Sequence, residues 1–169
     1  MPLRTPSDFF EDLLLYRIYR LSSVAGAMMV RLCEGSYGIT RREWRILALL
    51  HGNDGLTPSA MAEKVQLDRA RTSRAIGALV KKKLIVRTPA VADRRVAQLA
   101  MTTQGKKVYA ELMPQVQDIN QRILATLTDE ESAQFRHSLD RLRLGAQGLY
   151  DEMMVDLPKT QRRLGKKGQ

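Results

Sequence analysis

Apolar residues recur every three or four positions over long stretches of the chain, as one face of an α-helix requires. The first stretch, residues 7–34, predicts one long helix, which the glycines at 35 and 38 end. A second stretch runs over 102–127, and Pro114 inside it is expected to kink the helix. The last helix is predicted from its apolar stripe, which comprises Phe135, Leu139, Leu142, Ala146, Leu149 and Met153.

Capping signals between these stretches predict shorter helices. A Thr-x-x-Glu capping box at residues 40–43 begins a helix to about residue 50, and a second capping box at 128–131 begins the last helix. A Thr-Pro pair opens a helix over 57–65. Asp68 is placed to cap a helix to about residue 83. Two β-prone runs, 85–88 and 96–101, predict a hairpin with a charged tip.

The predicted fold class is therefore mainly α with one small β-hairpin. A helix of ~25 residues is nearly 40 Å long, which is more than a compact three-helix unit can cover. We therefore expect the terminal helices to pack against a second copy of the chain, giving a two-fold homodimer.

Composition excludes several classes of protein. A chain of 169 residues suits one domain rather than a two-domain enzyme, and it holds no phosphate-cradling glycine loop or Gly-x-Ser-x-Gly turn. One cysteine, Cys33, excludes an intramolecular disulfide and a four-cysteine zinc site, and two histidines exclude a multi-histidine metal centre. We expect no enzymatic activity and no cofactor. The chain has no apolar membrane-spanning stretch and no secretory start, so a cytoplasmic location is expected.

The positive charge gathers in the middle of the chain. The chain has 28 basic and 18 acidic residues, and residues 40–95 hold 13 of the basic and 5 of the acidic ones. Two short helices joined by a tight turn in this segment form a helix-turn-helix, whose second helix carries arginines near its start. Arginine can pair with guanine or phosphate, and an arginine at the hairpin tip suits the narrow minor groove. The residues expected to contact double-stranded DNA are Thr57, Ser59, Arg69, Arg71, Thr72, Ser73, Arg74, Asp93, Arg94 and Arg95.

Each of these arginines alone could equally be a solvated surface charge. Their clustering on three adjacent elements favours a DNA-binding surface. Asp93 is expected to hold the arginine side chains of the hairpin tip in position.

Residues 39–101 resemble the winged helix-turn-helix of the multiple antibiotic resistance regulator (MarR) family, and the similarity extends over roughly residues 8–154. The resemblance rests on Glu43-Trp44-Arg45-Ile46-Leu47, Gly55-Leu56-Thr57-Pro58, Asp68-Arg69-Ala70-Arg71-Thr72-Ser73-Arg74, Asp93-Arg94-Arg95 and Leu99-Ala100-Met101-Thr102-Thr103-Gln104-Gly105. It implies a homodimeric regulator that binds a short inverted repeat, usually as a repressor, and is released by a small anionic or phenolic ligand. A ligand would achieve that release if it held the DNA-reading second helices of the two helix-turn-helices at the wrong spacing for successive major grooves.

The resemblance also suggests a domain organisation. Residues 1–38 would form an N-terminal dimerisation helix, 39–101 the winged helix-turn-helix, and 102–157 the C-terminal dimerisation helices. Residues 158–169 would be a basic tail, expected to be disordered, that either follows DNA phosphates or is simply a soluble end.

Aromatic residues concentrate near the N-terminus: six of the nine lie in the first 44 residues, beside arginines on a largely apolar helix. Aromatic walls and a guanidinium suit an aromatic carboxylate. The candidate effector-binding residues are Arg17, Arg20, Tyr37, Trp44 and His51. The alternatives are that the aromatics form a dimer core with intersubunit ion pairs, and that His51 merely caps a helix.

Cys33 is either a peroxide sensor or, in our interpretation, an inert buried thiol.

The main competing function is an architectural DNA-binding protein without sequence preference or effector. Sequence preference would separate the two functions, because specific sites typically bind ~10³–10⁷ times tighter than random duplex.

Overall fold

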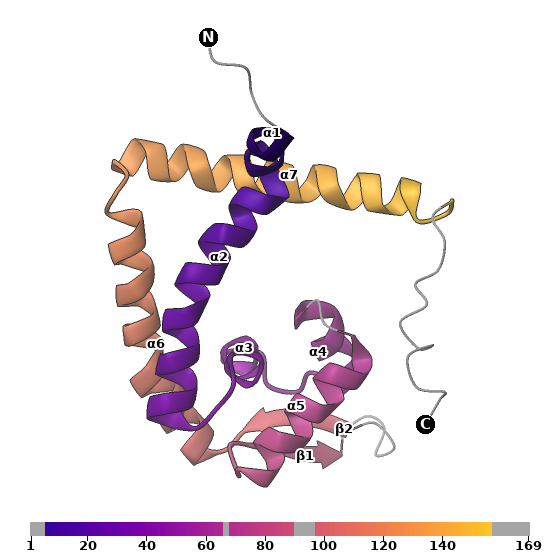
Figure 1. Cartoon of the computed structure of the whole chain (residues 1–169). Coiled ribbons are helices and arrows are strands. Elements are labelled where there is room, and N and C mark those ends of the chain that lie inside the picture. The colour runs from indigo at the N-terminus through magenta and orange to yellow at the C-terminus, as the bar shows by residue number, and fades with distance from the viewer. Residues whose placement is uncertain (1–5, 66–67, 90–96, 157–169) are drawn as a thin grey trace, which may run out of the picture. The chain divides into compact units, whose positions relative to one another are not determined.

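The computed structural model describes residues 6–65, 68–89 and 97–156, and it divides into two units, one up to Asp118 and one from Ile119 onward. Within these described residues, ten helices and strands follow one another (Figure 1). The helical and hairpin elements expected from the sequence are all present, with differences in the first helix.

The N-terminal helix is interrupted, whereas the sequence predicted one continuous helix. Helix α1 (Pro6–Asp12) and helix α2 (Leu14–Val30) are separated at Leu13, whose backbone is extended with φ −61° and ψ 128°. The break brings the rings of Phe10 and Tyr16 to 4.4 Å between centroids. Residues six apart on a continuous helix would lie on different faces, so this contact needs the break.

A widened turn continues α2. The π-helical segment η1 (Arg31–Ser36) follows it directly, and the amide of Ile39 donates to the carbonyl of Cys33 at 3.1 Å. Gly38 then takes a positive φ of 61°, which glycine adopts without strain. The predicted end of the helix near residues 35–38 is confirmed.

Three helices and a hairpin form the middle of the first unit. Helices α3 (Arg41–Leu50), α4 (Pro58–Val65) and α5 (Arg69–Lys81) pack on one another, beside strands β1 (Ile85–Pro89) and β2 (Ala97–Met101) (Figure 1). The strands are antiparallel, with Ile85 opposite Met101 and Pro89 opposite Ala97. A bridge between Leu56 and Leu99 ties the turn before α4 to β2.

One apolar core holds these elements together. Its fully buried large side chains come from each of α3, α4, α5, β1 and β2 and from the following helix, and they include Ile46, Leu47, Leu50, Met61, Ile76, Leu79, Ile85, Leu99 and Leu112. Burying a side chain of this size contributes ~1.5–3 kcal/mol. The core therefore fixes the position of α5 relative to the rest of the unit.

Helix α6 (Thr103–Leu124) begins against the end of α5 and runs through Pro114 without ending there. Its first turn lies directly on backbone: a Cβ on Gly105 would come within 2.0 Å of the carbonyl oxygen of Leu84. The hydroxyl of Thr102 donates to the carbonyl of Lys83 at 2.7 Å and accepts from the amide of Gly105 at 2.9 Å. Glycine is needed here because no side chain fits.

Helix α7 (Asp129–Met153) forms most of the second unit. The predicted capping box is confirmed: the amide of Glu131 donates to the hydroxyl of Thr128 at 3.2 Å, and the amide of Thr128 donates to the carboxylate of Glu131 at 2.8 Å. The hydrogen bonds from the backbone and side chain of Thr128 lower the pKa of Glu131.

Candidate nucleic-acid interface

Helices α4 and α5 form the helix-turn-helix expected from the sequence. Thr57 begins α4, because its hydroxyl accepts from the amide of Ala60 at 3.1 Å. Asp68 begins α5, because its carboxylate accepts from the amide of Arg71 at 2.7 Å. A side-chain oxygen at this position satisfies an amide that the helix leaves without a partner.

Most of the predicted DNA-contacting residues on these helices are exposed. Arg69, Arg71, Ser73 and Arg74 on α5 and Ser59 on α4 lie at the surface. Thr57 is half-buried. The Nε of Arg71 lies 3.0 Å from the carboxylate of Asp68, so the residue that caps α5 also holds one of its arginines.

Thr72 is turned away from this surface, so its expected contact with DNA is not possible in this conformation. The residue is 1% exposed, and its hydroxyl donates to the backbone carbonyl of Asp68 at 3.1 Å. It shares a helix face with Ile76 and Leu79, four and seven residues further along, both of which are fully buried. Thr72 is therefore part of the core side of α5.

The three residues of the predicted hairpin tip, Asp93, Arg94 and Arg95, lie outside the described residues, as does the tail from 158 to 169. The strands that carry the tip are described, and their antiparallel pairing confirms the hairpin itself.

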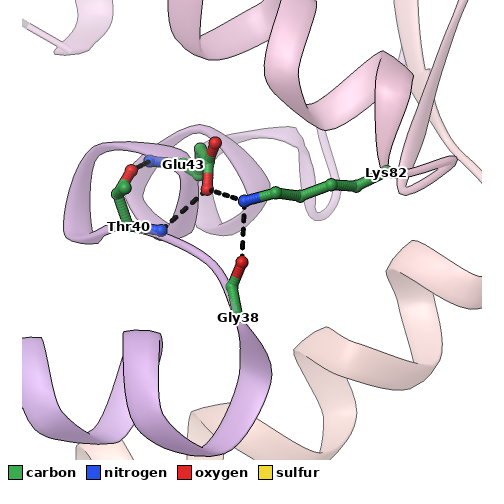
Figure 2. A network of polar contacts seen from close by, with 4 residues as sticks. All are labelled: Gly38, Thr40, Glu43 and Lys82. Atoms are coloured by element: carbon green, nitrogen blue, oxygen red, sulfur yellow. Dashed lines mark hydrogen bonds and ion pairs between the residues drawn. The ribbon is translucent and has the colours of Figure 1, made fainter.

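The C-terminal end of α5 is fixed by a polar network that joins it to the start of α3 (Figure 2). Lys82 extends its side chain to the carboxylate of Glu43, with Nζ 2.7 Å from Oε2, and also donates to the carbonyl of Gly38 at 2.7 Å. The same carboxylate oxygen accepts from the amide of Thr40 at 2.7 Å, which completes the predicted capping box of α3. One buried carboxylate thus stabilises the start of α3 and holds the end of α5.

The backbone after α5 closes in a Schellman motif. The amide of Leu84 donates to the carbonyl of Leu79 at 3.0 Å, and the amide of Lys83 donates to the carbonyl of Val80 at 2.9 Å. Lys83 has a φ of +58°, the left-handed conformation in which glycine is usual. Both ends of α5 are therefore held by local contacts.

The predicted effector-binding residues do not all come together in one chain. Trp44 and His51 both stack on Tyr109 of α6, with ring centroids 5.6 and 4.0 Å away. Tyr37 is half-buried, and its hydroxyl accepts from the Nε2 of Gln115 at 2.5 Å. The rings of Trp44, Tyr109 and His51 form a stack, and no motif in the sequence marked Tyr109 as a member of it.

The two candidate arginines lie elsewhere, on α2. Both are exposed, and the guanidinium of Arg17 lies 3.3 Å from the carboxylate of Asp12. A cavity of about 430 Å³ lies beside the ring stack, and its lining does not include Arg17 or Arg20. That lining is formed by Leu50, His51, Gly52, Asp54, Met101, Lys106, Tyr109 and Ala110.

Cys33 is fully buried in the core, as we expected of an inert thiol. Burial raises the pKa of the Cys33 thiol, an effect that Arg41 partly offsets and Glu34 reinforces. A raised pKa keeps the less reactive protonated form at neutral pH.

In the described parts of the chain, no helix is long and apolar enough to cross a membrane. Those same parts contain no group of three or more histidine, cysteine or carboxylate side chains placed to hold a metal ion.

Comparisons with known proteins agree with this geometry. A family model described as "MarR family" matches residues 37–96. The HTH-type transcriptional repressor MdtR of Bacillus subtilis is 31% identical over 110 residues, which cover 65% of this chain and 71% of that protein. A putative transcriptional regulatory protein for the hcr operon of Thauera aromatica is 29% identical over 127 residues, covering 75% of this chain and 76% of the relative.

Among solved structures, the MepR–DNA complex of Staphylococcus aureus contains a chain with the same fold. Its TM-score is 0.71 at 23% sequence identity, and the match covers 80% of this chain and 99% of that one. The fold, the helix-turn-helix and the relatives agree: the chain belongs to the MarR family and is a DNA-binding winged-helix transcriptional regulator rather than an enzyme.

Proposed function

We propose that this chain acts as a homodimer that binds an inverted-repeat operator and represses transcription until a small anionic or phenolic molecule releases it. The observation that carries the proposal is the exposed arginine-bearing face of α5, on a helix held at its ends by Asp68 and Lys82. Two such helices related by a two-fold axis would enter successive major grooves ~34–36 Å apart. The repressor name of the Bacillus subtilis relative supports the direction of regulation.

An apolar stripe on α7, exposed among the described residues, supports the homodimer. Its large side chains are 37–54% exposed. They recur every three or four residues, with Ala146 filling the one wider interval. The large side chains are Phe135, Leu139, Leu142, Leu149 and Met153. Helices α1 and α2, and Leu13 between them, likewise expose large apolar side chains, which are Phe9, Phe10, Leu13, Leu14, Ile18 and Leu21. Contiguous apolar surface of this kind marks an interaction site, and a second copy carries the matching surface.

Sedimentation tests the homodimer. The wild-type chain should sediment as a dimer, and Leu142→Asp should shift it towards monomer because a carboxylate would enter the apolar stripe. Leu144→Asp is the matched control, since Leu144 is 61% exposed and lies on the opposite side of α7. A monomeric wild type, or equal effects of the two substitutions on a folded chain, would contradict the homodimer.

The cavity beside the ring stack supports release by a planar aromatic acid. Its volume of about 430 Å³ lies within the ~300–1,000 Å³ usual for small-molecule sites. The rings of His51 and Tyr109 line it, and Lys106 is the lysine or arginine of its lining that could pair with a carboxylate. In one chain, Lys106 thus takes the role that the sequence suggested for Arg17 or Arg20.

Displacement of a labelled operator by benzoates and hydroxybenzoates tests this site. Lys106→Gln should raise the concentration needed for release, while Lys107→Gln should not, because Lys107 lies outside the cavity lining and faces Glu111 at 4.0 Å. Equal effects of the two substitutions, or no release by any aromatic acid, would reject the site. If Arg20→Ala abolished release and Lys106→Gln did not, the anion would bind at α2.

A further inference from the structure

A second hollow lies between the start of α3 and α5. It has a volume of about 410 Å³. Apart from Glu43, its lining consists of Thr40, Arg42, Arg71, Arg74, Ala75 and Ala78. We name it the α3–α5 groove.

Three guanidiniums give this groove its charge. Arg42 comes from α3, and Arg71 and Arg74 come from α5. The single carboxylate in the lining, Glu43, is 5% exposed and lies 2.7 Å from the Nζ of Lys82, so its charge is already compensated. Arg71 is paired in turn with Asp68 at 3.0 Å, so Arg42 and Arg74 give the groove its net positive charge toward an incoming group.

The geometry of α5 keeps the groove open. Arg71, Arg74 and Ala78 are spaced by three and four residues and form one stripe that faces α3. The small side chain at position 78 leaves room between the arginines. Asp68 holds the Nε of Arg71 at 3.0 Å, which restricts that side chain before any ligand binds.

We propose that the α3–α5 groove binds a phosphate group of the DNA backbone and that Arg42 is a phosphate-contacting residue outside the helix-turn-helix. Arginine pairs with the oxygens of a phosphate in a fork geometry, and three arginines from two helices suit one such group. The outermost stripe of α5, with Ala70, Gly77 and Lys81, would face the base edges, and Arg74 lies between that stripe and the groove. The groove lies on the flank of that stripe, where a strand backbone passes when a helix enters the major groove.

The salt dependence of DNA binding tests the proposal. Arg42→Gln should reduce the slope of log affinity against log salt by about 0.9 per bound chain, as expected for one lost phosphate contact. At 0.15 M salt this corresponds to about a fivefold loss of affinity per bound chain. The loss should be the same on random-sequence duplex and on any preferred site, because a phosphate contact carries no sequence information.

Arg136→Gln on α7 is the matched control, because it removes the same charge from an exposed helix position. It should leave the salt slope within error of wild type. Thermal unfolding of both variants checks that each is folded. An unchanged slope for folded Arg42→Gln would overturn the proposal, and so would a loss confined to the preferred site, since that would make Arg42 a base-reading residue.

The groove could instead bind a free anion rather than a phosphate of DNA, and a titration with inorganic phosphate separates these two possibilities. Phosphate is titrated into the protein without DNA while the arginine side-chain NMR signals are followed. Binding that Arg42→Gln abolishes, together with an unchanged DNA salt slope, would overturn the proposal in favour of a small-anion site. The inference rests only on DNA binding, and random duplex is sufficient to test it, so it survives if operator repression or effector release fails.

Discussion

Removing the amino group of Lys82 is expected to destabilise the protein more than the partial exposure of the Lys82 side chain suggests. Lys82→Met deletes both contacts of the ammonium, to the carboxylate of Glu43 and the carbonyl of Gly38, each 2.7 Å long. The Glu43 side chain is 5% exposed and that of Lys82 is 37% exposed. Loss of a partner costs ~3–5 kcal/mol for a fully buried ion pair and ~0–1 kcal/mol for an exposed one.

The pair lies between these limits, because Glu43 keeps its hydrogen bond from the amide of Thr40. We therefore expect Lys82→Met to lower the free energy of unfolding by ~2 kcal/mol, or the Tm by ~4–8 °C for a chain of this size. Lys81→Met is the control: it removes a neighbouring exposed lysine from the end of the same helix, so any interaction with the helix dipole is common to both variants.

Thermal and urea unfolding at one fixed protein concentration provide the assay, because oligomerisation makes the apparent stability depend on concentration. A double-mutant cycle with Glu43→Gln should give a coupling energy of ~1 kcal/mol or more between the two side chains. Equal stabilities of Lys82→Met and Lys81→Met, or a coupling below ~0.3 kcal/mol, would refute the reasoning.

Three further predictions concern single positions. Gly105→Ala should destabilise by ~1–3 kcal/mol despite alanine's better helix propensity, since its methyl would overlap the carbonyl oxygen of Leu84; unchanged urea unfolding would contradict this. Lys83→Gly should stabilise by ~0.5–1 kcal/mol because it relieves a φ of +58°, and a lower Tm would count against it. Cys33 should resist an aromatic disulfide reagent at pH 8 in the native protein and react on unfolding, because burial raises its pKa; rapid native labelling would contradict this.

Structural features that depend on residues within one turn of helix could be predicted from the sequence. The two capping boxes, with Thr40 and Thr128 as caps, begin α3 and α7 where predicted, because cap and partner are three residues apart. Asp68 begins α5 for the same reason. The antiparallel hairpin likewise followed from two short β-prone runs close together in the chain.

Features that depend on contacts between residues far apart in the chain could not be predicted from the sequence. Lys82 meets Glu43 across 39 positions of sequence, and Tyr109 joins the ring stack from a helix far from Trp44 and His51. The break at Leu13 is marked by no glycine or proline in the adjacent sequence. Only the completed packing reveals these three features.

The burial of Thr72 was within reach of the sequence. Its spacing to Ile76 and Leu79 places it on the apolar side of α5, yet its position among arginines favoured a DNA contact. A helical phase set by neighbouring core residues is thus a better guide to exposure than residue type alone.

The most direct test of the central claim is a binding selection from a random duplex pool at physiological salt, with sequencing of the retained DNA. The account predicts enrichment of an inverted repeat whose half-sites lie about one helical turn apart, because two α5 helices of a dimer would read it. Tight binding without any enriched motif would contradict the account, and would instead indicate an architectural DNA-binding protein that contacts phosphates alone.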